Sequence, residues 1–329
     1  MGMKYRKNLG RPGVIVANMS YKGGTGKTSN IFTMLCLLAQ QAVHILAVDM
    51  DPQANLTRRF GVSPDDFEGN ITAALHGITL NPTSWGPLQM RENVFDVKMP
   101  GINQHVDLLP GSETFENATT LLERRRDPNV HTRLRLGLET LRDYYDFIFI
   151  DTPPGADNLR SALVLNSVDV LLLPVDGFDA LLGATTLLEA AQKEAEERKR
   201  DGRAPLRAFL YVPHLINSTH SDPETTPWYR SASREFPSHF IPQVVRHSST
   251  HQKSHLSGRG WTGLSWKTQQ QYSQMFQHLM GLMQNSAYMP LLDWLEAQKM
   301  SLPEIRQRIE QDRLRDSKTE TVISRIKYR

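Results

Sequence analysis

The amino-acid sequence predicts an α/β fold: a doubly wound, mostly parallel sheet flanked by helices, with a helical extension at the C-terminus. Short β-branched and aliphatic runs recur along the chain, and most are nearly continuous in apolar residues. Such runs are typical of strands that are buried on both faces of a parallel sheet. Segments with helical periodicity lie between them, and strands that alternate with helices build a doubly wound fold.

Seven runs are predicted to be strands, at residues 13–19, 43–50, 105–109, 146–151, 168–175, 206–212 and 240–245. The clearest helix follows the first strand, where apolar residues at 31, 34, 35 and 38 recur at i, i+3, i+4 and i+7. Residues 184–200 begin apolar and end in a run of Glu, Lys and Arg, as in an amphipathic surface helix. The stretch 218–238 is rich in Ser, Thr and Pro and is predicted to be a loop.

Three segments are predicted along the chain: a basic N-terminal segment 1–12, a main domain 13–289 and a charged helical extension 290–329. The extension contains Ser-Leu-Pro-Glu at 301–304, a capping box with proline in the first turn of a helix. Ile305 and Ile309 would form a narrow apolar stripe on that helix.

The charge of the 329-residue chain is nearly balanced, with 38 Lys and Arg against 35 Asp and Glu, but it is unevenly distributed. No acidic residue occurs before Asp49 or between Glu235 and Asp293. These stretches form either a solvated polar surface or a face that tolerates a phosphate backbone nearby.

The single cysteine, Cys36, excludes an intramolecular disulfide and a cysteine-built metal cluster. Because the apolar runs are too short to cross a bilayer, the expected location is the cytoplasm.

A glycine-rich loop follows the first predicted strand and opens the first predicted helix. Residues 21–29 are Tyr-Lys-Gly-Gly-Thr-Gly-Lys-Thr-Ser, close to the phosphate-loop pattern G-x-x-x-x-G-K-[ST], with Tyr21 at the first glycine position. Glycines let backbone N–H groups turn towards phosphate oxygens, and the helix N-terminus favours negative charge. Lys27 would reach the β- and γ-phosphates, and the Thr28 hydroxyl would hold Mg²⁺. The alternative is a glycine-rich turn with a coincidental lysine. The predicted nucleotide contacts within the loop are Gly23, Gly24, Thr25, Gly26, Lys27, Thr28 and Ser29.

The run Lys-Gly-Gly-Thr-Gly-Lys-Thr-Ser at 22–29 resembles the deviant Walker A motif of the ParA/MinD family of P-loop ATPases. That family commonly lacks the first glycine and carries a second lysine near the start of the loop, here Lys22. The resemblance implies that Lys22 crosses a nucleotide-sandwich dimer and touches the phosphates bound by the other subunit. A cation that arrives only on dimerisation can stabilise charge on the transferred phosphoryl group. The alternative is a solvated loop lysine.

Carboxylates follow two of the predicted strands. Residues 48–53, Val-Asp-Met-Asp-Pro-Gln, are similar to the family's D-x-D-P-Q segment, and aspartates at i and i+2 project to the same side of a strand. The resemblance implies that Asp51 positions or activates the attacking water and that Asp49 supports the water shell of Mg²⁺. The alternative for both is a strand-end cap.

The strand 146–151 ends in Asp151 as in a Walker B motif, so Asp151 is a predicted Mg²⁺ ligand. The Asp-Thr-Pro-Pro that follows resembles the ParA branch.

The resemblance covers residues 13–285 and includes departures. Gln243 stands where the family often has arginine, which leaves a DNA contact there in doubt. Four basic residues in or near the acid-free stretch are candidate contacts to DNA: Arg246, Lys253, Arg259 and Lys267.

The resemblance implies a cytoplasmic Mg²⁺-dependent ATPase that dimerises with ATP, binds DNA without sequence preference and positions or segregates DNA or other cargo. A ParB-like or other adaptor protein would stimulate hydrolysis.

An alternative is a MinD-like or secretion-associated ATPase that acts on membrane or protein partners. The end of the chain is short and poorly amphipathic, which disfavours membrane attachment. A third alternative, an ATP-dependent synthetase such as dethiobiotin synthetase, is disfavoured by Lys22 and the D-P-Q segment. The cargo stays open between a plasmid, a chromosome, a conjugative element and a protein cluster.

Overall fold

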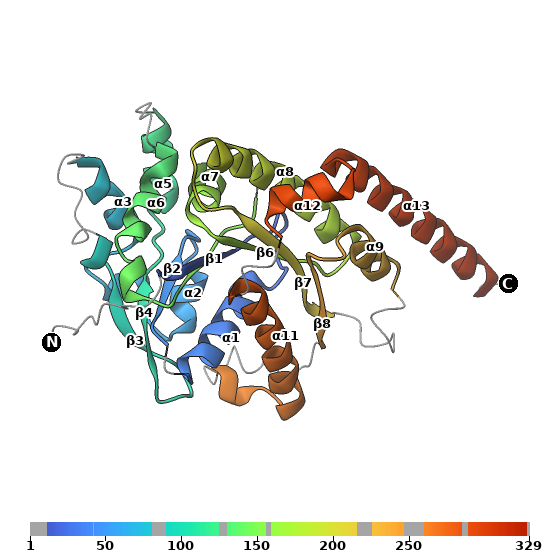
Figure 1. Ribbon diagram of the computed structural model, residues 1–329. Helices are drawn as coiled ribbons and strands as arrows, with labels where there is room; N and C mark the ends of the chain where they lie inside the picture. The colour runs from blue at the N-terminus through green and yellow to red at the C-terminus, as the bar shows by residue number, and fades with distance from the viewer. Residues whose placement is uncertain are drawn as a thin grey trace.

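The computed structural model describes residues 12–41, 43–80, 90–124, 130–155, 159–215, 226–246, 260–284 and 289–327. Eight strands in these ranges form one sheet in the order β3-β4-β2-β5-β1-β6-β7-β8 (Figure 1). Every neighbouring pair is parallel except β3 and β4, which are antiparallel. The strands are β1 (Val14–Asn18), β2 (Ile45–Asp49), β3 (Phe95–Lys98), β4 (His105–Leu109), β5 (Phe147–Asp151), β6 (Val170–Pro174), β7 (Arg207–Leu215) and β8 (Phe240–Arg246).

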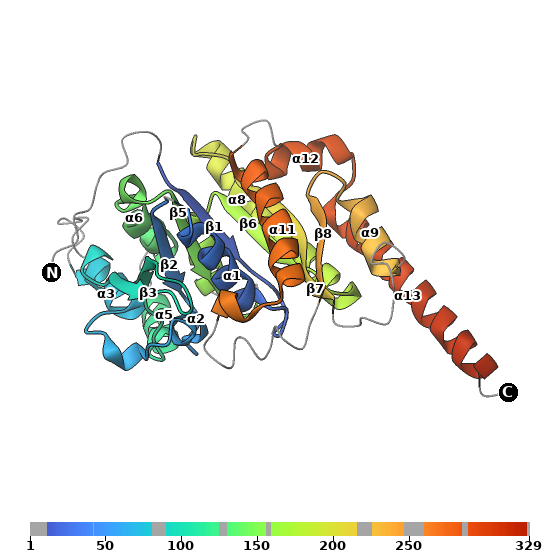
Figure 2. The same cartoon turned by 90° about the horizontal axis from the view of Figure 1, so that it is seen from below.

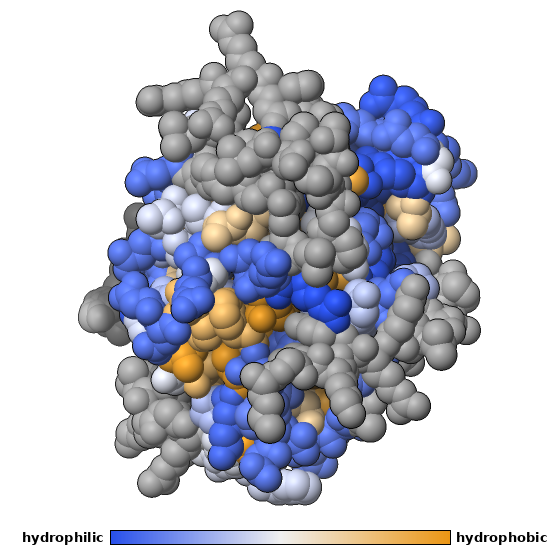
Figure 3. Space-filling view, turned by 90° about the vertical axis from the view of Figure 1, so that its left-hand side faces the viewer, coloured by the Kyte–Doolittle hydropathy of each residue, from blue (hydrophilic) through white to orange (hydrophobic). Residues whose placement is uncertain are grey.

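All seven predicted strands are confirmed, and one further strand, β3, was missed. β3 has four residues, and its charged side chains Asp96 and Lys98 are exposed while Val97 is buried. A short alternating strand at a sheet edge needs only one buried face, so it lacks the continuous apolar run of the central strands. On the face seen from the left-hand side of Figure 1, where β3 lies, the coloured residues include hydrophilic areas around a central hydrophobic area, with smaller hydrophobic areas beside it (Figure 3).

Helices cover both faces of the sheet, as a doubly wound fold requires (Figure 2). Helices α1, α2 and α11 lie on one face, and the remaining α-helices lie on the other. In β5, Ile148 and Ile150 point into one core while Phe147 and Phe149 point into the second. The helices are α1 (Lys27–Ala39), α2 (Asn55–Arg59), α3 (Ile71–Leu80), α5 (Phe115–Arg124), α6 (Arg133–Glu139), α7 (Leu159–Ser167), α8 (Phe178–Arg200), α9 (Pro227–Glu235), α11 (Trp266–Gln284), α12 (Leu291–Gln298) and α13 (Leu302–Lys327), with 3-10 turns η1 (Pro64–Asp66), η2 (Val130–Thr132), η3 (Arg142–Tyr144) and η5 (Gly260–Gly263).

Helix α9 corrects the prediction of a loop over 218–238. Residues 216–225 lie outside the described ranges, but Pro227–Glu235 are helical. Pro227 occupies the first turn, where its missing N–H costs nothing, and Tyr229 and Ala232 are buried in the core. The polar composition suggested a loop, whereas burial of one apolar face stabilises a short helix there.

The C-terminal extension is helical, as predicted, and its capping box is confirmed. The Ser301 backbone N–H donates to Glu304 Oε2 at 2.7 Å, and the Glu304 N–H donates to Ser301 Oγ at 3.4 Å. Ile305 and Ile309 are buried against the core, and the rest of α13 extends away from the body (Figures 1 and 2). The boundary at residue 290 stays a prediction. No helix within the described ranges combines the length and apolar character needed to cross a membrane.

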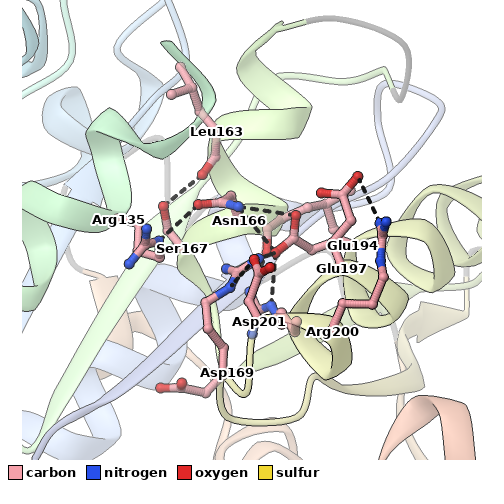
Figure 4. A network of polar contacts seen from close by, with 12 residues as sticks. Arg135, Leu163, Asn166, Ser167, Asp169, Glu194, Glu197, Arg200 and Asp201 are labelled. Carbon is pink, nitrogen blue, oxygen red and sulfur yellow. Dashed lines mark hydrogen bonds and ion pairs between the residues drawn. The ribbon is translucent and has the colours of Figure 1, made fainter. Parts of the chain in front are cut away.

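A buried charge network joins α7 to α8 at the amino ends of the strands (Figure 4). Glu194 Oε1 accepts hydrogen bonds from Arg198 Nε and Arg203 Nη2, both at 2.9 Å. Asn166 Nδ2 donates to the same carboxylate at 3.1 Å, and Asn166 Oδ1 accepts from Arg135 Nε at 3.0 Å. The Glu194 side chain is 10% exposed, so its charge is balanced by protein groups rather than by water.

Replacing Glu194 with Gln is expected to lower the free energy of unfolding by about 3 kcal/mol, because it leaves two arginines near each other without their shared carboxylate. Urea denaturation measures this change. Glu196→Gln is the control: Glu196 is exposed on the same helix, so its change should stay within about 0.5 kcal/mol. Equal effects of the two substitutions would contradict a stabilising role for the network.

Candidate functional site

The strand order brings the predicted site residues together at the carboxyl edge of the sheet. β5 lies between β1 and β2, and its register aligns Asp151 with Asn18 on one side and with Asp49 on the other. The loop that follows β1 lies at this same edge and leads into α1. Ligands of open α/β sheets bind at the carboxyl ends of the strands. The structure therefore gathers the glycine-rich loop and the two carboxylates into one site.

The loop has the backbone conformation that its glycines permit. Gly24 and Gly26 have φ angles of 81° and 77°, in the left-handed region that favours glycine. Gly26 is the N-cap residue of α1 and supplies no side-chain cap. The first N–H groups of the helix therefore remain available to an anion, which the helix dipole also favours.

Ser20 organises the lysine side of the loop and was not predicted from the sequence. Its Oγ accepts hydrogen bonds from Lys27 Nζ at 2.7 Å and from Thr25 Oγ1 at 2.9 Å, and it donates to the Lys22 carbonyl at 2.7 Å. Burial lowers the pKa of Lys27, while the nearby Asp151 acts in the opposite direction. A serine between a strand and a glycine-rich loop was the only signal in the sequence. Its role became visible only through these contacts.

Asp151 and Thr28 form a site whose chemistry fits Mg²⁺. Thr28 Oγ1 donates to Asp151 Oδ2 at 2.7 Å, whereas the fully buried Asp151 Oδ1 has no hydrogen-bond partner. Burial raises the pKa of Asp151, and the neighbouring Asp49 raises it further. A carboxylate oxygen without a partner, next to a hydroxyl, suits a hard cation that takes oxygen ligands. Mg²⁺ is bound through one or two carboxylates and keeps waters or phosphates as its other ligands.

Asp49 holds together the segments on the other side of the site. Its Oδ2 accepts from the Thr57 N–H and hydroxyl, both at 2.8 Å, and its Oδ1 accepts from the Asp51 N–H at 3.1 Å. The Thr57 hydroxyl also accepts from the Gly111 N–H at 3.0 Å. A Cβ on Gly111 would lie 2.9 Å from Asp49 Cγ, so only glycine fits without displacement. Both oxygens of Asp49 thus have protein partners, and its support of the Mg²⁺ water shell stays a prediction.

Asp51 lies just beyond β2 and borders a cavity of about 1200 Å³ that the loop residues 23–29 also line. Its Oδ1 accepts from the Gln53 N–H at 2.9 Å, and Asn55 Nδ2 donates to its Oδ2 at 3.3 Å. The side chain is half-buried. Asp51 therefore has a local capping contact, as the alternative interpretation predicts, and it also faces the cavity that a catalytic residue would need to face.

Lys22 lies on a different side of the loop from Lys27. It borders a second cavity, of about 500 Å³, between the loop and helices α8 and α13. Its Nζ lies 3.8 Å from Asp179 Oδ2, and Arg313 Nη2 of α13 lies 2.9 Å from Asp179 Oδ1. The side chain of Lys22 is 65% exposed, so this pair contributes little to stability. Tyr21, at the position of the missing glycine, packs against Gly183 of α8.

The four candidate DNA contacts are only partly covered by the described residues. Lys267 is exposed in the first turn of α11, and Arg246 is the last residue of β8. Lys253 and Arg259 lie outside the described ranges. A shared DNA-binding face for these residues stays a prediction.

Comparison with known proteins gives similarity in sequence and in fold. A family model described as an AAA domain matches residues 13–201. A ParA family protein of Chlamydia trachomatis is 28% identical over 173 residues, which cover 52% of this chain and 62% of that protein. The sporulation initiation inhibitor protein Soj of Bacillus subtilis is 28% identical over 181 residues, 55% of this chain and 65% of Soj. The chain thus spans less than two thirds of the length of these relatives.

A solved structure, the McdA–ATP complex from Cyanothece, superimposes with a TM-score of 0.61 over 82% of this chain and 98% of that chain. Its sequence identity is 18%. At this identity the likeness shows the fold alone.

Proposed function

Because the chain belongs to the ParA/MinD-type P-loop ATPases, we propose that it hydrolyses ATP with Mg²⁺ and acts as a dimerising switch that binds DNA in its ATP state. One observation carries this proposal. The sheet brings the glycine-rich loop, the Thr28–Asp151 pair and Asp51 to one edge, where the loop, Thr28 and Asp51 line a cavity large enough for a nucleotide. The similar McdA structure is a complex with ATP.

Each residue at this edge has a role in the proposed reaction. The loop amides and Lys27 would bind the phosphates, while Thr28 and Asp151 would hold Mg²⁺. When bound, Mg²⁺ neutralises charge on the phosphate oxygens. Asp51 would orient the attacking water or accept its proton, which a side chain bordering the same cavity is placed to do.

Lys22 would complete the site of a second copy of the chain. Its exposed ammonium group borders the second cavity and is not among the residues that line the first. A lysine on the outer side of the loop is suited to reach another subunit, where it would stabilise charge on the transferred phosphoryl group. Dimerisation and hydrolysis would then depend on the same residue.

DNA would be bound without sequence preference by basic residues of the acid-free stretch, among which Lys267 is exposed. A ParB-like or other adaptor protein would stimulate hydrolysis and end the DNA-bound state. A cytoplasmic location stays a prediction. One observation favours the alternative partner class: α13 extends beyond the body and offers an exposed, charged helix to a protein (Figure 2).

We expect a random-sequence DNA duplex to bind the wild-type chain with ATP and Mg²⁺ but not with ADP. Lys22→Ala should lose this binding, since it removes the residue proposed to join the dimer. The binding should weaken steeply as salt rises, because each phosphate contact releases counterions. Fluorescence anisotropy of a labelled duplex measures all three effects. DNA affinity that is equal with ATP and ADP would contradict the switch. ATP-driven dimers that bind no DNA would favour a protein or membrane partner instead.

A further inference from the structure

Helix α2 carries two consecutive arginines in different surroundings. Arg58 is exposed, and its Nη2 lies 3.5 Å from Glu113 Oε1. Arg59 is half-buried, and its Nη2 donates to Ser29 Oγ at 2.8 Å. Neighbouring positions on a helix point about 100° apart, so the two side chains project in different directions. Both arginines and the phosphate loop line the same 1200 Å³ cavity, but only Arg59 contacts the loop through a hydrogen bond.

Arg59 is a cation held inside the site without a counter-ion of its own. Among the residues that the structure describes, no carboxylate lies within ion-pair distance of it, and Ser29 supplies its hydrogen-bond acceptor. No nitrogen of Arg59 is buried without a partner, so its remaining donors are accessible, and the residue lines the cavity. Burial lowers the pKa of Arg59 while Asp151 opposes this effect, and a guanidinium stays charged in proteins. An inward-facing cation of this kind is stabilised by an anionic ligand.

The position of Ser29 indicates which part of a ligand Arg59 would meet. Ser29 is the third residue of α1, in the turn whose N–H groups and dipole favour phosphate. Lys27 enters this turn from the side of Ser20, and Arg59 reaches it from α2. Guanidinium groups bind phosphate through two parallel N–H···O bonds, which a lone lysine cannot provide.

We infer that Arg59 is a second phosphate-binding cation, supplied by α2 of the same subunit, that binds the phosphates of nucleoside di- and triphosphates. This inference rests on the proposed function, in which the cavity binds ATP. Arg59 would strengthen the binding of ATP and ADP alike. It would act before hydrolysis, whereas Lys22 would act in the ATP dimer.

The placement of Arg59 also links the nucleotide to Asp51. Helix α2 begins four residues after Asp51, and Thr57 ties it to Asp49. Ala54, between Asp51 and α2, has a φ of 49°, a left-handed conformation that costs a non-glycine residue about 1–2 kcal/mol. A strained residue of this kind persists only where the surrounding structure holds it in place. A phosphate bound by Arg59 would therefore hold α2, and with it the Asp51 segment, in place.

The test compares nucleotide affinities of four proteins: wild type, Arg59→Gln, Arg59→Lys and Arg58→Gln. Isothermal titration with ADP and with ATP, each with Mg²⁺, measures the Kd. Arg59→Gln should weaken both nucleotides about 10- to 100-fold, the range for charge-assisted hydrogen bonds. Arg59→Lys should lose about 10-fold or less, since it keeps the charge but not the paired N–H groups. Although Arg58 borders the same cavity, Arg58→Gln should change the Kd less than about threefold, because its charge is exposed to solvent and lies near Glu113.

Two outcomes would overturn the inference. The first is an unchanged Kd in Arg59→Gln while wild type binds nucleotide, with or without a lower kcat. The second is an equal loss in Arg58→Gln, which would indicate a general charge effect. Failure of wild type to bind either nucleotide would contradict the proposed function as well, so the two failures are distinguishable. If Arg59→Gln does not fold, as judged by circular dichroism, the Kd of Arg59→Lys decides by the same criteria.

Discussion

Asp151→Asn is expected to make the nucleotide-free protein more stable while abolishing Mg²⁺-dependent ATP hydrolysis. Burial raises the pKa of Asp151 in the folded state, so ionising this carboxyl opposes folding. The protonated carboxyl contributes to the free energy of unfolding below the pKa of the unfolded chain. This contribution is lost as the pH rises through the raised pKa of the folded state. Asparagine stays neutral at every pH. The variant should therefore gain at least about 1 kcal/mol at pH 7.5, and the gain should shrink towards pH 5.

Urea denaturation at several pH values, with a chelator and without nucleotide, measures the gain. Hydrolysis should fall at least about 100-fold, because the amide can no longer hold Mg²⁺ as a carboxylate does. Asp65→Asn is the control: Asp65 is exposed, so neither stability nor hydrolysis should change with this substitution. A variant that is less stable than wild type at pH 7.5 would contradict the idea that a buried charge is kept here for metal binding.

Asp51→Asn is expected to keep ATP binding and to lose hydrolysis by at least about 100-fold, the contribution of a positioned general base. The substitution separates the two interpretations of Asp51. The amide oxygen of asparagine can still accept the hydrogen bond from the Gln53 N–H, so a capping role survives. The asparagine amide cannot accept a proton from water, so a role as general base is lost. ATP titration and single-turnover hydrolysis measure the two properties.

The matched control for Asp51 is Asn55→Ala, which removes a hydrogen bond to the carboxylate and leaves the carboxylate itself. Its hydrolysis rate should stay within about fivefold of wild type, since exposed side-chain hydrogen bonds contribute little. Undiminished hydrolysis in Asp51→Asn would show that Asp51 is a strand-end cap. Under the proposed function, Asp51→Asn should also accumulate ATP-bound dimers, which size-exclusion chromatography detects.

The phosphate loop could be predicted because its chemistry is local. The left-handed backbone of Gly24 and Gly26 and the start of α1 depend on neighbouring residues, which a short pattern records. The central strands were predictable for a similar reason, since burial on both faces leaves a continuous apolar run. β3 and α9 were missed because each buries one face only, and its sequence looks polar. Ser20 and Arg59 were missed because no spacing rule connects a single hydroxyl or arginine to the loop.

The fold class, the strand–loop–helix with its phosphate-loop pattern and the order of the carboxylates along the chain could be predicted from the sequence, since these depend on local backbone preference and apolar periodicity. Which carboxylates meet could not be predicted, because it depends on the strand order. The insertion of β5 between β1 and β2 aligns Asp151 with Asp49, although 102 positions separate them in the sequence. The tertiary structure likewise placed Arg59 against Ser29 and Arg313 against Asp179. Such contacts depend on strand order and helix packing, which involve residues far apart in the sequence. No short segment therefore contains a pattern that predicts them.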